Sequence, residues 1–390
     1  MRYPPVTGVQ PNVLKWARES IGLSVLDVSI RLKKDEHIVL EWESGESAPT
    51  YPQLEDLAYR LYKRPLAVFF LPEPPHERLP EADFRTLPDA DFEELHPDTY
   101  LQIRKAHAFQ LSLDEVFSGQ VERSKSICSN IELDLSQDIS SQASAVRSFL
   151  GVSLSTQKGW KNVEEALRDW RKRIEEVGVF VFKSAFKQKE ISGFCLYDDL
   201  FPIVYLNNST TKTRQIFSLL HELAHLLLHQ NSLSKFDKSY VGDLSLDQQK
   251  IEVFCNALAA EVLIPSSDFE YESSGLPYNL DTVEDRVFEQ LAARYSVSRE
   301  AILRRFLDSG RVSQNRYLSK REEWNSQKKK GSGGNYYATT NAYLSQTFAQ
   351  AVVGLHYQNR ISLSQAADYL GVKAKSFAGI EQFILSGNDR

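Results

Sequence analysis

The most constraining feature of this chain is an apolar segment that carries His221, Glu222 and His225 in the pattern His-Glu-x-x-His. Residues 218–228 around it predict a helix that is packed inside the protein. Because side chains at positions i and i+4 of a helix share one face, both imidazoles can reach one Zn²⁺ ion. Glu222 then lies where it can take a proton from water. The alternative is a buried helix whose histidines only bond to backbone carbonyl groups.

A catalytic zinc site needs three protein ligands and one open position, so a third ligand must come from another segment. Residues 251–265 predict a second apolar helix, ended by Pro265, with Glu252 and Asn256 on one face. Glu252 is the preferred third ligand. Cys255 is a softer alternative that helical geometry does not exclude. The ligand types favour Zn²⁺, although Mn²⁺, Co²⁺ and Ni²⁺ accept similar ligands.

The region around these helices resembles the ImmA/IrrE metallopeptidases from residue 160 to about residue 305. The resemblance rests on the order and spacing of the histidine helix and of residues 178–182, 191–194, 202–207 and 251–265. It implies a zincin-like domain, placed at residues 160–310, in which a small sheet supports the helices. It also implies that His221, His225 and Glu252 bind zinc and that Glu222 is the catalytic base.

Three further side chains near this region are weaker candidates. His229 continues the face of His225, but eight residues of helix carry it about 12 Å from His221 along the axis. That distance is too long for one ion, so we expect His229 to support the site or cap the helix. Tyr205 and Tyr240 are candidate hydrogen-bond donors to an oxyanion, and the sequence does not choose between them.

Residues 9–72 carry a different pattern. Amphipathic segments separated by turn residues predict five short helices, at 12–18, 23–32, 35–42, 49–58 and 65–70. The run Glu41-Trp-Glu-x-Gly45, followed by Pro49, resembles XRE/Cro-type helix-turn-helix domains. The resemblance implies binding to double-stranded DNA, for which Lys33, Lys34 and His37 are the first contacts to test.

The charge of the candidate recognition helix opposes that interpretation. A helix that faces phosphates should be basic, whereas residues 35–46 contain five carboxylates. Protein recognition or dimerisation through the same fold is therefore the alternative. A homodimer is compatible with the pattern, since helix-turn-helix units commonly pair.

Composition limits the class of protein. The 390 residues, 42% hydrophobic and 25% charged, are typical of a globular chain of two or three domains. A net charge of −6 argues against a nucleic-acid scaffold, though not against one basic surface. Three widely spaced cysteines form no disulfide framework, and no apolar run suits a membrane span or signal peptide. We therefore expect a cytoplasmic protein without membrane contact.

The predicted fold class is α+β and mostly helical. The expected order is a five-helix domain at 9–72, a proline-rich linker at 73–98, a helical connecting region at 99–159, the metallopeptidase domain at 160–310 and a helical accessory domain at 335–390. A Lys- and Gly-rich segment at 328–334 predicts a flexible hinge before the last of these.

Two functions follow from these expectations. The first is a zinc-dependent endopeptidase with Glu222 as general base. Its resemblance implies a regulatory protein as substrate, such as a repressor or antitoxin, cleaved in a stress response or in mobile-element control. The alternative is a DNA-binding regulator or antitoxin that keeps the peptidase fold only to recognise a partner. The intact Glu222 favours the first, because a structural zinc site has no need of it.

Overall fold

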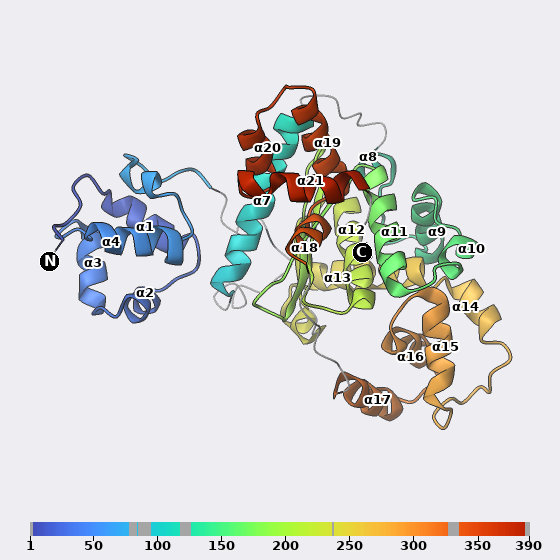
Figure 1. Ribbon diagram of the computed structural model, residues 1–390. Coiled ribbons are helices and arrows are strands. Elements are labelled where there is room, and N and C mark those ends of the chain that lie inside the picture. Colours follow the sequence, from blue (N-terminus) through green and yellow to red (C-terminus); the bar gives the residue numbers. More distant parts are fainter. Residues whose placement is uncertain are drawn as a thin grey trace. The chain divides into compact units, whose positions relative to one another are not determined.

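The computed structural model describes residues 3–77, 84, 95–117, 126–235, 238–326 and 335–386 (Figure 1). The chain divides into two compact units, Met1–Lys105 with Phe186–Gln188 and Ala106–Ala185 with Lys189–Arg390. Most of the predicted linker at 73–98 and all of segment 328–334 lie outside the described residues. None of the described helices combines the length and apolarity needed to cross a membrane.

Short helices make up the N-terminal unit, in the order that the sequence predicts. They are α1 (Pro11–Glu19), α2 (Val25–Leu32), α3 (Glu36–Ser44), α4 (Tyr51–Glu55) running into η1 (Asp56–Leu61), and η2 (Leu66–Phe70). A capping box of Ser24 and Asp27 starts α2, and Gly45, at φ 84°, ends α3. The buried Arg18 joins α1 to α3 through hydrogen bonds of 2.7 and 2.9 Å to Glu43. One of the five carboxylates in residues 35–46 therefore forms an ion pair inside this unit and is not part of its exposed surface.

The second unit contains a four-stranded mixed sheet. Its strands are β1 (Phe180–Ser184), β2 (Ile191–Leu196), β3 (Ile203–Asn207) and β4 (Ser232–Lys235), in the spatial order β1-β3-β2-β4. β1 and β3 are parallel, and the other two pairs are antiparallel. A Cβ atom on Gly193 would lie 2.8 Å from the carbonyl oxygen of Tyr205, so glycine is needed for β2 and β3 to pair. Within the described chain, β4 forms one edge of this sheet.

Helix α12 (Lys212–Leu227) packs on one face of the sheet, and α13 (Leu246–Leu263) packs against α12. Two further helices, α9 (Ile139–Phe149) and α11 (Val163–Glu176), contact α13 and α12 respectively. Val204 and Leu206 of β3 share one apolar core with Leu219 and Leu223 of α12. This core fixes the distance of α12 from the sheet and determines which side of the helix faces the strands.

The opposite face of the sheet is covered by α7 (Pro97–Phe117) and α19 (Gln346–Tyr357). The ring of Phe109 stacks on Phe182 of β1 with 4.1 Å between centroids, and Phe348 meets both rings at an angle. Arg171 of α11 donates hydrogen bonds to the carbonyl groups of Ala342 and Leu344. The C-terminal helices thus pack on the sheet and belong to the same compact unit.

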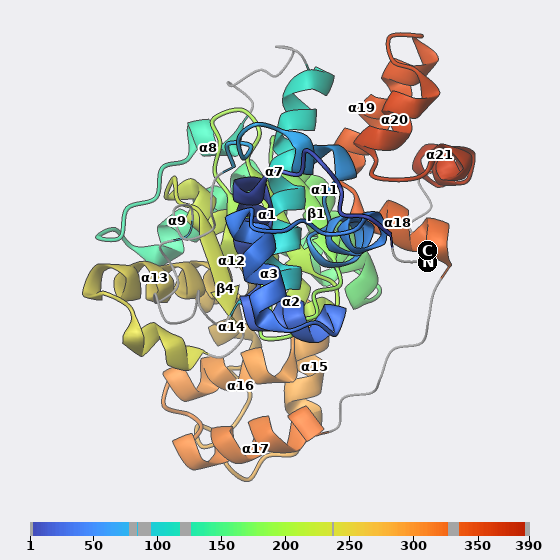
Figure 2. The same ribbon diagram turned by 90° about the vertical axis from the view of Figure 1, so that its left-hand side faces the viewer.

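The remaining elements complete this unit. They are α8 (Ile127–Asn130), α10 (Leu154–Lys158), η4 (Lys238–Asp243), α14 (Ser266–Glu272), α15 (Asp285–Tyr295), α16 (Arg299–Asp308), α17 (Gln314–Ser326), α18 (Tyr336–Tyr343), α20 (Leu363–Tyr369), η5 (Ala374–Ser376) and α21 (Phe377–Ser386). Helices α15 to α17 gather at one end of the unit and α19 to α21 at the other (Figure 1 and Figure 2). The described residues are mostly helical with one small sheet, which confirms the predicted α+β class.

Candidate metal centre

Helix α12 carries three of the predicted site residues and is buried along most of its length. His221 is 5% exposed, while Glu222 and His225 are fully buried. The helical spacing brings the Nε2 atoms of the two histidines to 3.2 Å from each other. Two ring nitrogens at this distance inside a protein need a proton or a cation between them.

Glu252 of α13 meets these two nitrogens. Its carboxylate oxygens lie 3.2 Å from Nε2 of His225 and 3.5 Å from Nε2 of His221. Nitrogen and oxygen ligands of a tetrahedral zinc ion, each at about 2.0–2.2 Å, stand roughly 3.3–3.6 Å apart. The measured separations are close to that range. The three buried side chains therefore form a group that could hold a metal ion.

Cys255, the alternative third ligand, lies in another position. It is fully buried on α13 beside His225, but among the described side chains it does not belong to the converging group. Burial raises the pKa of its thiol, and the nearby His225 opposes that effect. The geometry favours Glu252.

The hydrogen-bond partner of Glu222 is a residue of the sheet and not one of the histidines. The hydroxyl group of Ser232, on β4, donates a hydrogen bond to Oε2 of Glu222. Burial raises the pKa of Glu222 to about 7, against the lowering effect of nearby His225 and of the Ser232 hydroxyl group. A carboxyl group with a pKa near neutrality can both accept and release a proton, as a general base must.

Ser232 and its neighbour Ser234 are site residues that the sequence interpretation missed. Both are buried, and Ser234 lines the cavity beside the histidines. The signal was present in the alternation Ser-Leu-Ser-Lys, because strand side chains point to opposite faces in turn. Two polar residues at a spacing of two predict a strand that presents hydroxyl groups to one side.

A cavity of about 1050 Å³ adjoins the candidate metal centre. Its walls include His221 and Glu252 together with residues of α12, α13, α16 and α17. Along α12, Arg214, Phe217 and His221 follow at spacings of three or four residues, so one stripe of this helix faces the cavity. The cavity is at the upper end of the volumes of small-molecule sites and can accept several residues of a peptide.

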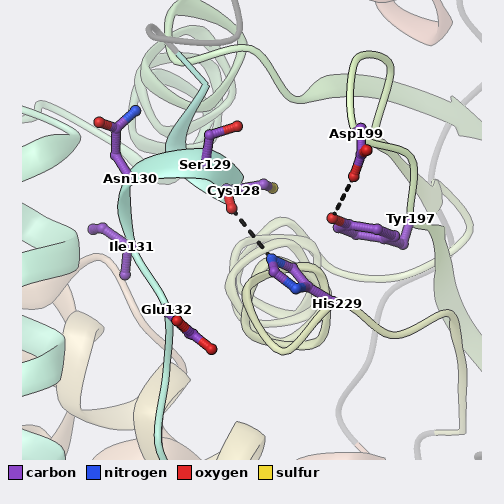
Figure 3. Close-up of a pocket in the computed structure, with 8 residues that line it drawn as sticks. All are labelled: Cys128, Ser129, Asn130, Ile131, Glu132, Tyr197, Asp199 and His229. Atoms are coloured by element: carbon purple, nitrogen blue, oxygen red, sulfur yellow. Dashed lines mark hydrogen bonds between the residues drawn. The ribbon is translucent and has the colours of Figure 1, made fainter.

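His229 lies at the far end of α12, in a smaller pocket of about 350 Å³ (Figure 3). Its backbone, at φ 55°, leaves the helix in the left-handed region. Its Nε2 atom lies 3.3 Å from the carbonyl oxygen of Cys128, and its ring is 4.8 Å from that of Tyr197. His229 therefore anchors the end of α12 and is not part of the metal group.

The structure rules out Tyr205 as an oxyanion donor at this site. Its ring stacks on Phe194 with 5.0 Å between centroids, on the face of the sheet turned away from α12. Neighbouring residues Val204 and Leu206 take the face toward α12. The side chain of Tyr240, the other candidate, lies outside the described part of the structure.

The three residues predicted to meet DNA are exposed on the N-terminal unit. Lys33, in a left-handed turn at φ 54°, joins α2 to α3, and Lys34 and His37 follow it. The same two helices expose Leu26, Ile30 and Leu40, each to more than half of its area. Helices α2 and α3 and the turn between them thus expose both basic and apolar side chains.

The second unit thus combines two imidazoles from one helix with a carboxylate from the next helix and a separate buried acid. This combination is typical of proteins with a hydrolytic metal centre. Residues 174–307 match the Peptidase_M78 family, described as an IrrE N-terminal-like domain. The match supports the resemblance to ImmA/IrrE proteins and a metallopeptidase-type function. It contains all four predicted site residues but neither the N-terminal helices nor the C-terminal ones. No curated protein matches the chain.

Proposed function

We propose that this protein is a zinc-dependent endopeptidase in which His221, His225 and Glu252 bind Zn²⁺ and Glu222 is the general base. One observation carries the proposal. The Nε2 atoms of two buried histidines and the carboxylate of the buried Glu252 converge, with separations of 3.2 to 3.5 Å, beside the buried Glu222, which is not one of this group. A purely structural metal site would not keep that additional acid.

Each side chain has a chemical role in this scheme. Zinc would polarise the scissile carbonyl group and acidify a water molecule. Ser232 holds Oε2 of Glu222, while Oε1 has no hydrogen-bond partner among the described residues. Oε1 is thus available to take the proton of the attacking water and to pass it to the leaving amide nitrogen.

The sheet supplies a surface for the substrate. β4 is an edge strand in the described structure, and Ser234 and Lys235 on it line the cavity. We propose that the peptide binds as an extended segment along β4, with its backbone hydrogen-bonded to the open edge. The fused helical unit supports a regulatory protein, such as a repressor or antitoxin, as the substrate class.

Removal of metal tests the proposal directly. The purified protein is expected to contain about one zinc ion per chain, and a chelator should abolish peptide cleavage until zinc is restored. Because zinc binds only the folded site, its removal should also lower the melting temperature by roughly 5 °C or more. Zinc analysis, a cleavage assay and thermal unfolding measure the three effects. Bound zinc without cleavage of any peptide would instead favour the non-proteolytic regulator.

A second candidate function, DNA binding by the N-terminal unit, is favoured by the exposed turn of Lys33, Lys34 and His37. Replacement of both Lys33 and Lys34 by Glu should weaken binding by at least about tenfold. The DNA probe is a duplex selected from random sequences. The slope of the logarithm of the affinity against the logarithm of the salt concentration should fall in magnitude by about two. Lys15→Glu, an exposed change on α1, is the matched control. Binding that is insensitive to the reversal, or absent at low salt, would leave protein recognition as the role of this unit.

A further inference from the structure

The cavity beside the candidate metal centre carries an excess of positively charged side chains. Among the described residues, its lining includes six Lys or Arg and five Asp or Glu side chains. One of the acids is Glu252 of the metal group, and another, Glu261, pairs with Arg305 at 2.7 Å. Zinc in the metal group would add to the positive potential. With zinc bound, the charged groups of the lining would therefore carry a net positive charge.

Basic side chains gather at the end of the cavity away from the metal group, where α12, α16 and α17 meet. Glu300 lies 3.2 Å from Arg321 and 3.9 Å from Arg214, so two guanidinium groups share one carboxylate. The longer distance exceeds that of a hydrogen bond. Arg304, next to them, pairs with Asp308 at 2.8 Å. A second carboxylate could thus approach Arg214 and Arg321 while Glu300 turns aside.

The position of Arg214 on α12 gives the distance between this charged group and His221, near which the peptide bond would be cleaved. Arg214 precedes His221 by seven residues, which is two helical turns, so both residues lie on one face of α12. Their Cα atoms are about 10 Å apart along the axis. An extended peptide advances about 3.3 Å per residue. For a peptide that runs alongside α12, a side chain that reaches Arg214 therefore belongs to a residue about three positions from the bond near His221.

We propose that the cavity selects peptides by an acidic side chain, about three residues from the cleaved bond, that Arg214 and Arg321 bind in competition with Glu300. This inference rests on the proposed peptidase function and adds the chemistry of its substrate. Guanidinium groups suit the role, since their planar donors match the two oxygens of a carboxylate. All three side chains are about one-quarter to two-fifths exposed, so they are open to a ligand.

Binding to the inactive full-length protein tests the inference without requiring turnover. The probes are fluorescein-labelled pools of 12-residue peptides, with one central position fixed as Glu, Gln or Lys. In the zinc-loaded Glu222→Gln protein, we expect the Glu pool to bind about fivefold more tightly than the Gln pool, and the Lys pool to bind most weakly. Fluorescence anisotropy gives the three affinities.

The variants give effects of opposite sign. Arg214→Gln and Arg321→Gln should each reduce the preference for the Glu pool, whereas Glu300→Gln should increase it because the competing carboxylate is lost. A merely structural role for this group would make all three changes harmful. Arg286→Gln, an exposed change on α15 outside the cavity lining, should change nothing. Circular dichroism and zinc content verify that each variant is folded.

Two results would overturn the inference: equal affinity for the three pools, or a Glu preference that survives both arginine substitutions. Failure of the proposed peptidase function looks different. In that case the protein with Glu222 intact would bind acidic peptides with the expected preference but would release them uncleaved.

Discussion

Replacement of Glu222 by Gln is expected to leave zinc bound and to lower the rate of peptide cleavage by about 10³-fold. Gln has nearly the same shape and can still bond to Ser232, but it cannot accept the proton of the attacking water. The amide also avoids the cost of burying a carboxylate, which raises the pKa of Glu222 to about 7. The variant should therefore be at least as stable as the wild type. Cleavage rate, zinc content and thermal unfolding measure these three outcomes.

Two companion variants separate proton transfer from general damage to the site. Ser232→Ala removes the hydroxyl group that holds Glu222 and should cost about tenfold in rate, since the base remains but is less well oriented. Glu176→Gln changes an exposed carboxylate on α11, with 49% of its side chain accessible, and should have no effect. Cleavage by the Glu222→Gln protein at the wild-type rate would remove Glu222 from the mechanism.

Replacement of Glu252 by Ala is expected to weaken zinc binding by at least about a hundredfold, and cleavage should disappear with the metal. The change leaves two imidazoles, which cannot complete a three-ligand site. In the metal-free protein the substitution removes the carboxylate partner of the buried His225, so a loss of stability is expected as well. Competition with a chromophoric chelator measures the affinity, and circular dichroism reports the fold.

Two other changes on α13 make this result specific. Asp247→Ala removes a carboxylate from the same helix, but its side chain is 88% exposed, so zinc binding should be unchanged. Cys255→Ala should also retain zinc, because the thiol lies outside the ligand group. If zinc were lost with Cys255 and kept without Glu252, the ligand set would have to be reassigned.

The helices of both units could be predicted because their signals are local. Segment 163–177 has a strong apolar stripe, and α11 spans Val163–Glu176. The predicted helix at 251–265 corresponds to α13, which begins earlier, at Leu246, where Ser245 caps it. Residues 202–207, one of the segments that carry the family resemblance, contain β3, which is buried throughout.

Tyr205 shows where such reasoning stops. Alternation along β3 separates Val204 and Leu206 from Tyr205, and a sequence predicts that the two sets face opposite ways. Both faces of β3 are buried, since helices cover both sides of the sheet. Hydrophobicity therefore could not indicate which face would meet α12, and the sequence could not exclude Tyr205 from the two candidate oxyanion donors.

Local chemistry was enough to place His221, Glu222 and His225 together, because one helical turn sets their spacing whatever surrounds it. The contact with Glu252 depends instead on how α13 packs against α12. The sequence offered Glu252 as a carboxylate on a second apolar helix and left Cys255 as the alternative, and the family resemblance supported Glu252. Ser232 reaches Glu222 from the sheet, and the Arg214, Glu300 and Arg321 group joins three helices. Contacts between segments far apart in the chain arise from packing of the whole unit, so they leave no periodic pattern in any one segment.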